Sequence, residues 1–213
     1  MKATKSLLAL IATALLGGNA CADPIQEPIR DYLSLQVPER SEFIGTLEFI
    51  QRVKVDVDGD GTDEIFIGTW YRHSGSNQAY YWSAYKEVKG GYQRVTPPNQ
   101  DIHIVSFENV YIGLIQEISK QGIVAAQDVE TDTPENAEVI KVGELHFYYV
   151  DEGGLVDKKS GSLDLSNAEQ KKTYDRYFGM STKTRKPTSI ETFTSQQLKQ
   201  MGYTIPNWEP PAP

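Results

Sequence analysis

Apolar residues after position 46 recur in short runs rich in Val, Ile, Tyr and Phe, which is the pattern of β-strands. Turn-forming residues separate these runs, and Gly90-Gly91 and Gln121-Gly122 predict tight hairpin turns. Because consecutive strands joined in this way pair in opposite directions, we expect a mainly antiparallel sheet. The predicted strands cover residues 47–57, 64–71, 79–88, 92–95, 102–105, 110–118, 123–129 and 139–150.

Helical spacing of apolar residues is confined to the two ends of this strand-rich region. Residues 25–35 predict a short N-terminal helix. Ser166 and Glu169 match a capping box, in which the two side chains bind free amides at a helix start, and Thr194 and Gln197 repeat the pattern. The sequence therefore predicts a single β-rich α+β domain with one N-terminal and two C-terminal helices.

The first 22 residues have the layout of a secretory signal. Lys2 and Lys5 precede an apolar run, and small residues end the segment at Ala22. The run is too short for a permanent membrane span, and no later stretch reaches the roughly 18 apolar residues that a span needs. We expect a signal peptide at 1–22, one folded domain at 23–205 and a proline-rich tail at 206–213 that is disordered or extended.

The only cysteine, Cys21, leaves two routes of processing open. Ordinary signal cleavage after Ala22 would release a periplasmic or secreted protein, and we favour this route because the residues before Cys21 match a lipoprotein signal poorly. The alternative is a lipid anchor on Cys21. In either case the folded domain has neither a disulfide nor a thiol nucleophile.

The charge of the chain restricts its partners. The net charge is −8, and loss of Lys2 and Lys5 with the signal would make it −10. Such a surface repels nucleic acids and attracts cations and basic proteins. We therefore expect a protein partner, with a basic one favoured, and no nucleic acid.

One loop has the residue pattern of a calcium site. Acidic residues occupy positions one, three, five and nine, and Gly61 at position six permits a sharp turn. Calcium needs several hard oxygen ligands, which alternate residues of a curled loop can supply. The predicted ligands are the side chains of Asp56, Asp58, Asp60 and Glu64 and the backbone carbonyl of Thr62. Asp63 should face outward, and without an ion the acidic groups should repel one another.

The loop is not an EF-hand, because position twelve is Ile67 instead of glutamate and a strand follows instead of a helix. It resembles the FG-GAP or VCBS-type calcium loop, in which acidic residues at these positions hold calcium between two strands. The resemblance covers about a dozen residues in a single copy. It implies a local calcium site and not the propeller fold of integrin-α-like proteins.

The sequence offers no recognisable catalytic set. It contains no G-x-S-x-G, H-E-x-x-H or S-x-x-K motif and no phosphate-binding loop. The histidines, His73, His103 and His146, are not at metal-ligand spacing, and we interpret them as surface or strand residues. This favours a non-catalytic protein.

An aromatic cluster follows the calcium loop on neighbouring predicted strands. Alternation along a strand sends its side chains to both faces, so one face should be core and the other is a candidate partner surface. The candidate surface consists of Trp70, Tyr81, Trp82 and Tyr85. We favour the other interpretation, in which these residues are core side chains and ordinary surface tyrosines.

These observations together favour an exported, non-catalytic, calcium-stabilised binding protein of the periplasm or cell surface. An inhibitor or immunity protein that acts on a protein partner would have this character. The alternatives are a calcium-dependent hydrolase of cell-wall or phosphate substrates and a glycan-binding module.

Overall fold

The computed structural model describes residues 25–35, 45–47, 49–71, 79–97, 102–104, 106–129, 142–151, 154–205 and 207–208. The predicted signal peptide with Cys21, His73 and most of the predicted tail lie outside the described residues.

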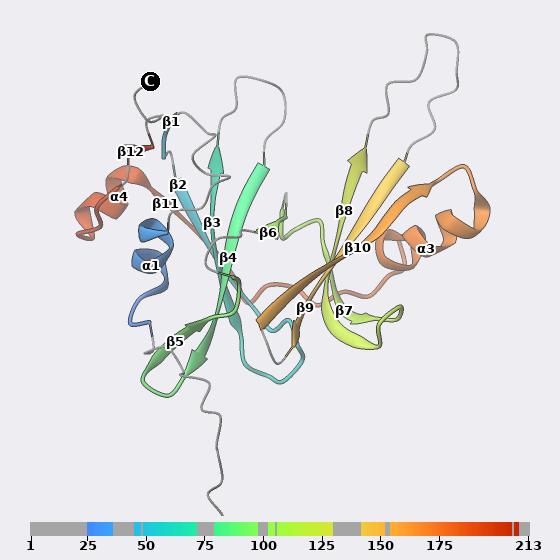
Figure 1. Cartoon of the computed structure of the whole chain (residues 1–213), viewed down its shortest axis with the longest axis horizontal. Helices are drawn as coiled ribbons and strands as arrows, with labels where there is room; N and C mark the ends of the chain where they lie inside the picture. Colours follow the sequence, from blue (N-terminus) through green and yellow to red (C-terminus); the bar gives the residue numbers. More distant parts are fainter. Residues whose placement is uncertain are drawn as a thin grey trace, which may run out of the picture.

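The strands divide between two larger antiparallel sheets and one small one (Figure 1). The six-stranded sheet contains β2 (Phe49–Val55), β3 (Glu64–Tyr71), β4 (Ala79–Val88), β5 (Gly91–Arg94), β6 (Ile102–His103) and β11 (Ser189–Thr194). The four-stranded sheet contains β7 (Tyr111–Ile115), β8 (Lys120–Val129), β9 (Val142–Asp151) and β10 (Gly154–Asp164). β1 (Gly45–Thr46) pairs with β12 (Asn207–Trp208).

The order of the strands places β3 in the middle of its sheet. The six-stranded sheet has the order β11-β2-β3-β4-β5, with β6 pairing to β4, and the four-stranded sheet has the order β10-β9-β8-β7. The sequence predicted antiparallel pairing, which the structure confirms. It did not indicate that the strands would separate into different sheets.

Helices cover the outer faces of the two larger sheets (Figure 1). α1 (Pro28–Ser34) and α4 (Ser195–Gln200) pack on the six-stranded sheet, whereas α3 (Ala168–Phe178) packs on the four-stranded sheet. The inner faces of the two sheets share a third apolar core. The predicted α+β fold, with one N-terminal and two C-terminal helices, is confirmed. No helix in the described part of the chain is long and apolar enough to cross a membrane.

Both faces of the central strands β3 and β4 are therefore largely buried. On β3, Ile65 and Ile67 face the helices, whereas Phe66 faces the core between the sheets. Because both faces are covered, the candidate aromatic partner surface is not present as predicted. Tyr81 is 6% exposed and Trp82 and Tyr85 are 0% exposed, so these three side chains belong to the protein interior. The side chain of Trp70 lies outside the described residues.

Two local predictions differ from the structure. Gln121 and Gly122 lie within β8, and residues 116–119 form the turn between β7 and β8. Gly122 is needed for close packing, because a Cβ atom there would lie 2.4 Å from the backbone oxygen of Tyr148 on β9. The N-cap of α3 is Asn167 instead of Ser166, since the Asn167 side chain accepts the free amides at the helix start. The capping box of Thr194 and Gln197 at α4 is confirmed.

Candidate metal centre

The predicted calcium loop connects β2 to β3 at the margin of the core between the two sheets. Val57 is 0% exposed and belongs to that core, so it anchors the start of the loop. Glu64 opens β3 two residues before Phe66, and alternation along a strand places both side chains on the same face. Glu64 is therefore drawn into the interior, where it is 0% exposed.

The loop backbone is curled around Asp56. The Asp56 Oδ1 atom accepts a hydrogen bond of 2.7 Å from the Gly59 amide, and Oδ2 accepts one of 3.3 Å from the Gly61 amide. Gly59 and Gly61 have φ angles of +79° and +87°, in the left-handed region that favours glycine. The predicted sharp turn at Gly61 is therefore present.

Three of the predicted ligands converge in the structure. One carboxylate oxygen from each of Asp56, Asp58 and Glu64 lies within 4.8 Å of the others. Calcium binds oxygen at about 2.3–2.6 Å, so two of its ligands lie at most about 5 Å apart. The spacing of these three groups therefore suits one calcium-sized cation. They are the one such cluster of three or more His, Cys, Asp and Glu side chains within the described residues.

Glu64 has one satisfied and one unsatisfied oxygen. Its Oε2 atom accepts a hydrogen bond of 2.8 Å from the Val57 amide, whereas its buried Oε1 atom accepts no hydrogen bond. Burial raises the pKa of Glu64 above its ordinary value, and the bond from Val57 partly opposes this effect. A buried carboxylate oxygen that accepts no hydrogen bond is costly, so a cation held by this oxygen and the two neighbouring carboxylates would stabilise it.

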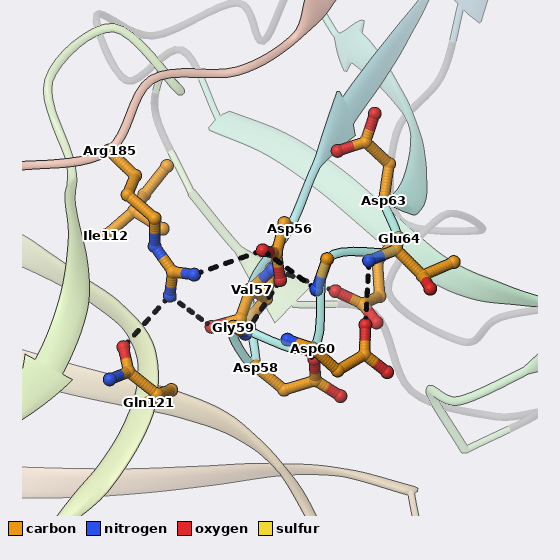
Figure 2. Close-up of polar contacts among 12 residues, drawn as sticks. Asp56, Val57, Asp58, Gly59, Asp60, Asp63, Glu64, Ile112, Gln121 and Arg185 are labelled. Carbon is orange, nitrogen blue, oxygen red and sulfur yellow. Dashed lines mark hydrogen bonds and ion pairs between the residues drawn. The ribbon is translucent and has the colours of Figure 1, made fainter.

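The other predicted loop residues lie at the edge of this group. Asp60 accepts a hydrogen bond of 2.8 Å from the Thr62 amide, and its carboxylate does not join the three converging ones. Ligation by Asp60 and by the Thr62 carbonyl stays a prediction. Asp63 points away from the other acidic side chains (Figure 2) and accepts a hydrogen bond of 3.0 Å from Thr188. This agrees with the expectation that Asp63 faces outward.

A lysine from the neighbouring strand reaches the same carboxylates. The Lys86 Nζ atom lies 2.8 Å from Asp58 Oδ2, 2.7 Å from Asp60 Oδ2 and 3.5 Å from Glu64 Oε1. Burial alone would lower the pKa of Lys86, but the bonds to Asp58 and Asp60 outweigh it and raise the pKa. The hydrogen bonds that Asp60 accepts from Lys86 and from the Thr62 amide lower the pKa of Asp60. The Lys86 ammonium ion and the Asp60 carboxylate thus stabilise each other in their charged forms.

An arginine from the segment after α3 contacts the other side of the loop (Figure 2). Arg185 lies 3.3 Å from Asp56 Oδ2 and donates hydrogen bonds of 3.0 Å to the Val57 carbonyl and to Gln121 Oε1. Because Gln121 belongs to β8, Arg185 links the loop to the four-stranded sheet. The repulsion expected within an ion-free loop is offset by Lys86 and Arg185, which the sequence did not indicate as loop partners.

A second polar cluster surrounds His146 on β9. His146 is 5% exposed, and its Nε2 and Nδ1 atoms lie 3.5 Å and 3.4 Å from carboxylate oxygens of Glu144 and Asp157. Tyr148 donates a hydrogen bond of 2.9 Å to the backbone oxygen of His103 on β6. His103 and His146 are strand residues, as expected. The alternation of Glu144, His146 and Tyr148 was the available sequence signal for a shared face.

No protein-family description matches this sequence, and comparisons with curated proteins and with solved structures find no similar protein. The chemistry of the site is therefore argued from its own residues.

Proposed function

We propose that this chain is an exported calcium-binding protein in which the ion stabilises the junction between the β2–β3 loop and the two sheets. The observation that carries the proposal is Glu64 Oε1, a fully buried carboxylate oxygen that accepts no hydrogen bond and lies beside Asp56 and Asp58. A bound cation would coordinate this oxygen, which lies 3.5 Å from the Lys86 ammonium ion but accepts no hydrogen bond.

The donor atoms favour calcium over other cations. The three converging groups offer only carboxylate oxygens, which are hard ligands, and neither imidazole nor thiolate takes part. Calcium accepts six to eight oxygens in a flexible arrangement, whereas magnesium demands a near-ideal octahedron. A loop that supplies three carboxylates within 4.8 Å of one another fits the calcium requirement better. The FG-GAP-like residue pattern supports the same assignment.

A structural role follows from where the loop is attached. Val57 lies in the core between the sheets, and Glu64 begins β3, so an ion between them would fix both ends of the loop. If calcium binds only the folded protein, a concentration one hundredfold above its dissociation constant adds about 2.7 kcal/mol to the free energy of unfolding. For a chain of this length that corresponds to about 5–10 °C in melting temperature.

We also propose that the calcium-stabilised domain acts as a non-catalytic binding protein outside the cytoplasm. The signal-like segment at 1–22 supports export. The net charge of −8 supports a basic protein partner, as an inhibitor or immunity protein would have. Because Tyr81, Trp82 and Tyr85 are buried, the partner would use a different surface.

Thermal unfolding with calcium and with a chelator tests the calcium proposal. The wild type is compared with Asp58→Asn, which removes a converging carboxylate, and with Asp63→Asn, which removes the same charge outside the cluster. Calcium should raise the melting temperature of the wild type and of Asp63→Asn, and the shift should be largely lost in Asp58→Asn. Equal melting temperatures in all samples, with no calcium bound to the wild type by metal analysis, would refute the proposal.

A further inference from the structure

Lys86 reaches the acidic loop because of the register between β3 and β4. It lies directly opposite Glu64 in that pairing. Trp82 and Ala84 precede it at alternate positions and belong to the core between the sheets, so alternation directs Lys86 to the margin of the same core. The fold itself thus brings this lysine to the loop.

The lysine engages carboxylates that a metal ion would need. Its ammonium ion donates hydrogen bonds to Asp58 and Asp60 and lies 3.5 Å from Glu64 Oε1. Asp58 and Glu64 are two of the three groups that converge within 4.8 Å. An ammonium ion and a divalent cation would therefore compete for the same two carboxylates.

The ammonium ion does not complete the site. Lys86 carries one positive charge and three donors, and Glu64 Oε1 accepts no hydrogen bond even though the ammonium lies nearby. A divalent cation would bring twice the charge and could contact oxygens in six to eight directions. A divalent cation would therefore stabilise these carboxylates more than the Lys86 ammonium ion does.

We propose that calcium binds by exchange with Lys86, so that this lysine is the residue that sets the calcium affinity of the site. The inference rests on the proposed calcium function. It implies that the ammonium ion leaves Asp58 and Glu64 when the metal enters, and that Asp60 is freed at the same step to become a ligand. Lys86 thereby weakens calcium binding, because its own contacts must be broken first.

Calcium titration by calorimetry tests the exchange in three proteins. Lys86→Met keeps an unbranched apolar stem of similar size but removes the ammonium group and its charge. Lys89→Met makes the same change three residues further on, at an exposed position in the turn after β4. We expect Lys86→Met to bind calcium about tenfold more tightly than the wild type, and Lys89→Met to bind like the wild type.

A second measurement uses the unmodified chain and so does not depend on the folding of a variant. Lysine amines are reductively methylated with and without calcium, and the modification of each lysine is read by peptide mass spectrometry. Lys86 should react slowly without calcium and several-fold faster with it, whereas Lys89 should react equally in both.

The outcomes separate the exchange from the calcium site itself. If the wild type binds calcium, but Lys86→Met binds no more tightly and Lys86 is modified equally with and without the ion, the exchange is refuted and the calcium site stands. If neither the wild type nor folded Lys86→Met binds calcium, the calcium function fails and the exchange fails with it.

Discussion

The guanidinium group of Arg185 lies 3.3 Å from the Asp56 carboxylate, although the two residues are 129 positions apart in the chain. Arg185 also donates a hydrogen bond to Gln121 on β8. One side chain thus connects the acidic loop of the six-stranded sheet to the four-stranded sheet. The conformation of the loop is therefore stabilised by Arg185 as well as by hydrogen bonds within the loop.

We predict that Arg185→Gln destabilises the protein by about 1–2 kcal/mol. Arg185 is about one third exposed, so its ion pair with Asp56 contributes little, and most of the loss comes from its hydrogen bonds to the Val57 carbonyl and to Gln121. The free energy of unfolding is measured by urea denaturation. Lys183→Gln, an equal charge change at an exposed position two residues earlier, should have a smaller effect. Equal losses in the two variants would contradict the role of Arg185.

We predict that Gly68→Ala destabilises the protein by about 1–3 kcal/mol. Gly68 pairs with Trp82 across β3 and β4, and a Cβ atom at this glycine would lie 2.4 Å from the Trp82 ring. The ring is fully buried and its indole nitrogen donates a hydrogen bond of 2.7 Å to the Ile104 carbonyl, so it has little freedom to move.

A double-mutant cycle tests this explanation. Replacing Trp82 with leucine removes the ring that would be crowded, so Gly68→Ala should cost less in the Trp82→Leu background than in the wild type. Strictly additive losses of unfolding free energy would mean that the glycine is required for another reason.

We predict that Tyr148 contributes a component of stability that is lost at alkaline pH. Burial raises the pKa of its phenol, and the nearby carboxylates of Asp157 and Glu144 act in the same direction. The folded protein therefore holds this proton more tightly than the unfolded chain. The contribution is complete below the ordinary tyrosine pKa of about 10 and declines above it by at most about 1.4 kcal/mol per pH unit.

Comparison of the wild type with Tyr148→Phe isolates this component, because the other titrating groups are common to both proteins. The difference in unfolding free energy between them should shift in favour of Tyr148→Phe as the pH rises from about 9 to about 11. A difference that stays constant over this range would show that Tyr148 ionises as easily in the folded protein as in the unfolded chain.

Features encoded by neighbouring residues were predictable from the sequence. The bounds of β3 and β4 match the predicted ranges, because β-branched and aromatic residues mark both strands. The helix at Thr194 follows from a capping box, whose partners are three residues apart. The turn at Gly61 and the convergence of Asp56 with Asp58 follow in the same way from local loop chemistry.

Four of the described strands were not predicted. β1 and β12 are only two residues long, and β10 and β11 were missed because their sequences are polar. β10 contains the exposed stretch from Asp157 to Ser162, and along β11 exposed residues alternate with partly buried ones. Each lies at an edge of its sheet, where only one neighbour supplies backbone hydrogen bonds. Such strands need few apolar residues, so hydrophobic periodicity does not mark them.

The sequence by itself determined an acidic, strand-rich chain with a glycine-containing loop that gathers carboxylates. Only the tertiary structure decided what surrounds that loop. Glu64 is buried because it lies on the face of β3 that packs against the four-stranded sheet. Lys86 contacts the loop from a position 28 residues beyond Asp58, and Arg185 contacts it from a position 129 residues beyond Asp56. Loop chemistry acts between near neighbours and leaves a signal in the sequence, whereas these charge contacts depend on strand register and sheet packing, which no local pattern specifies.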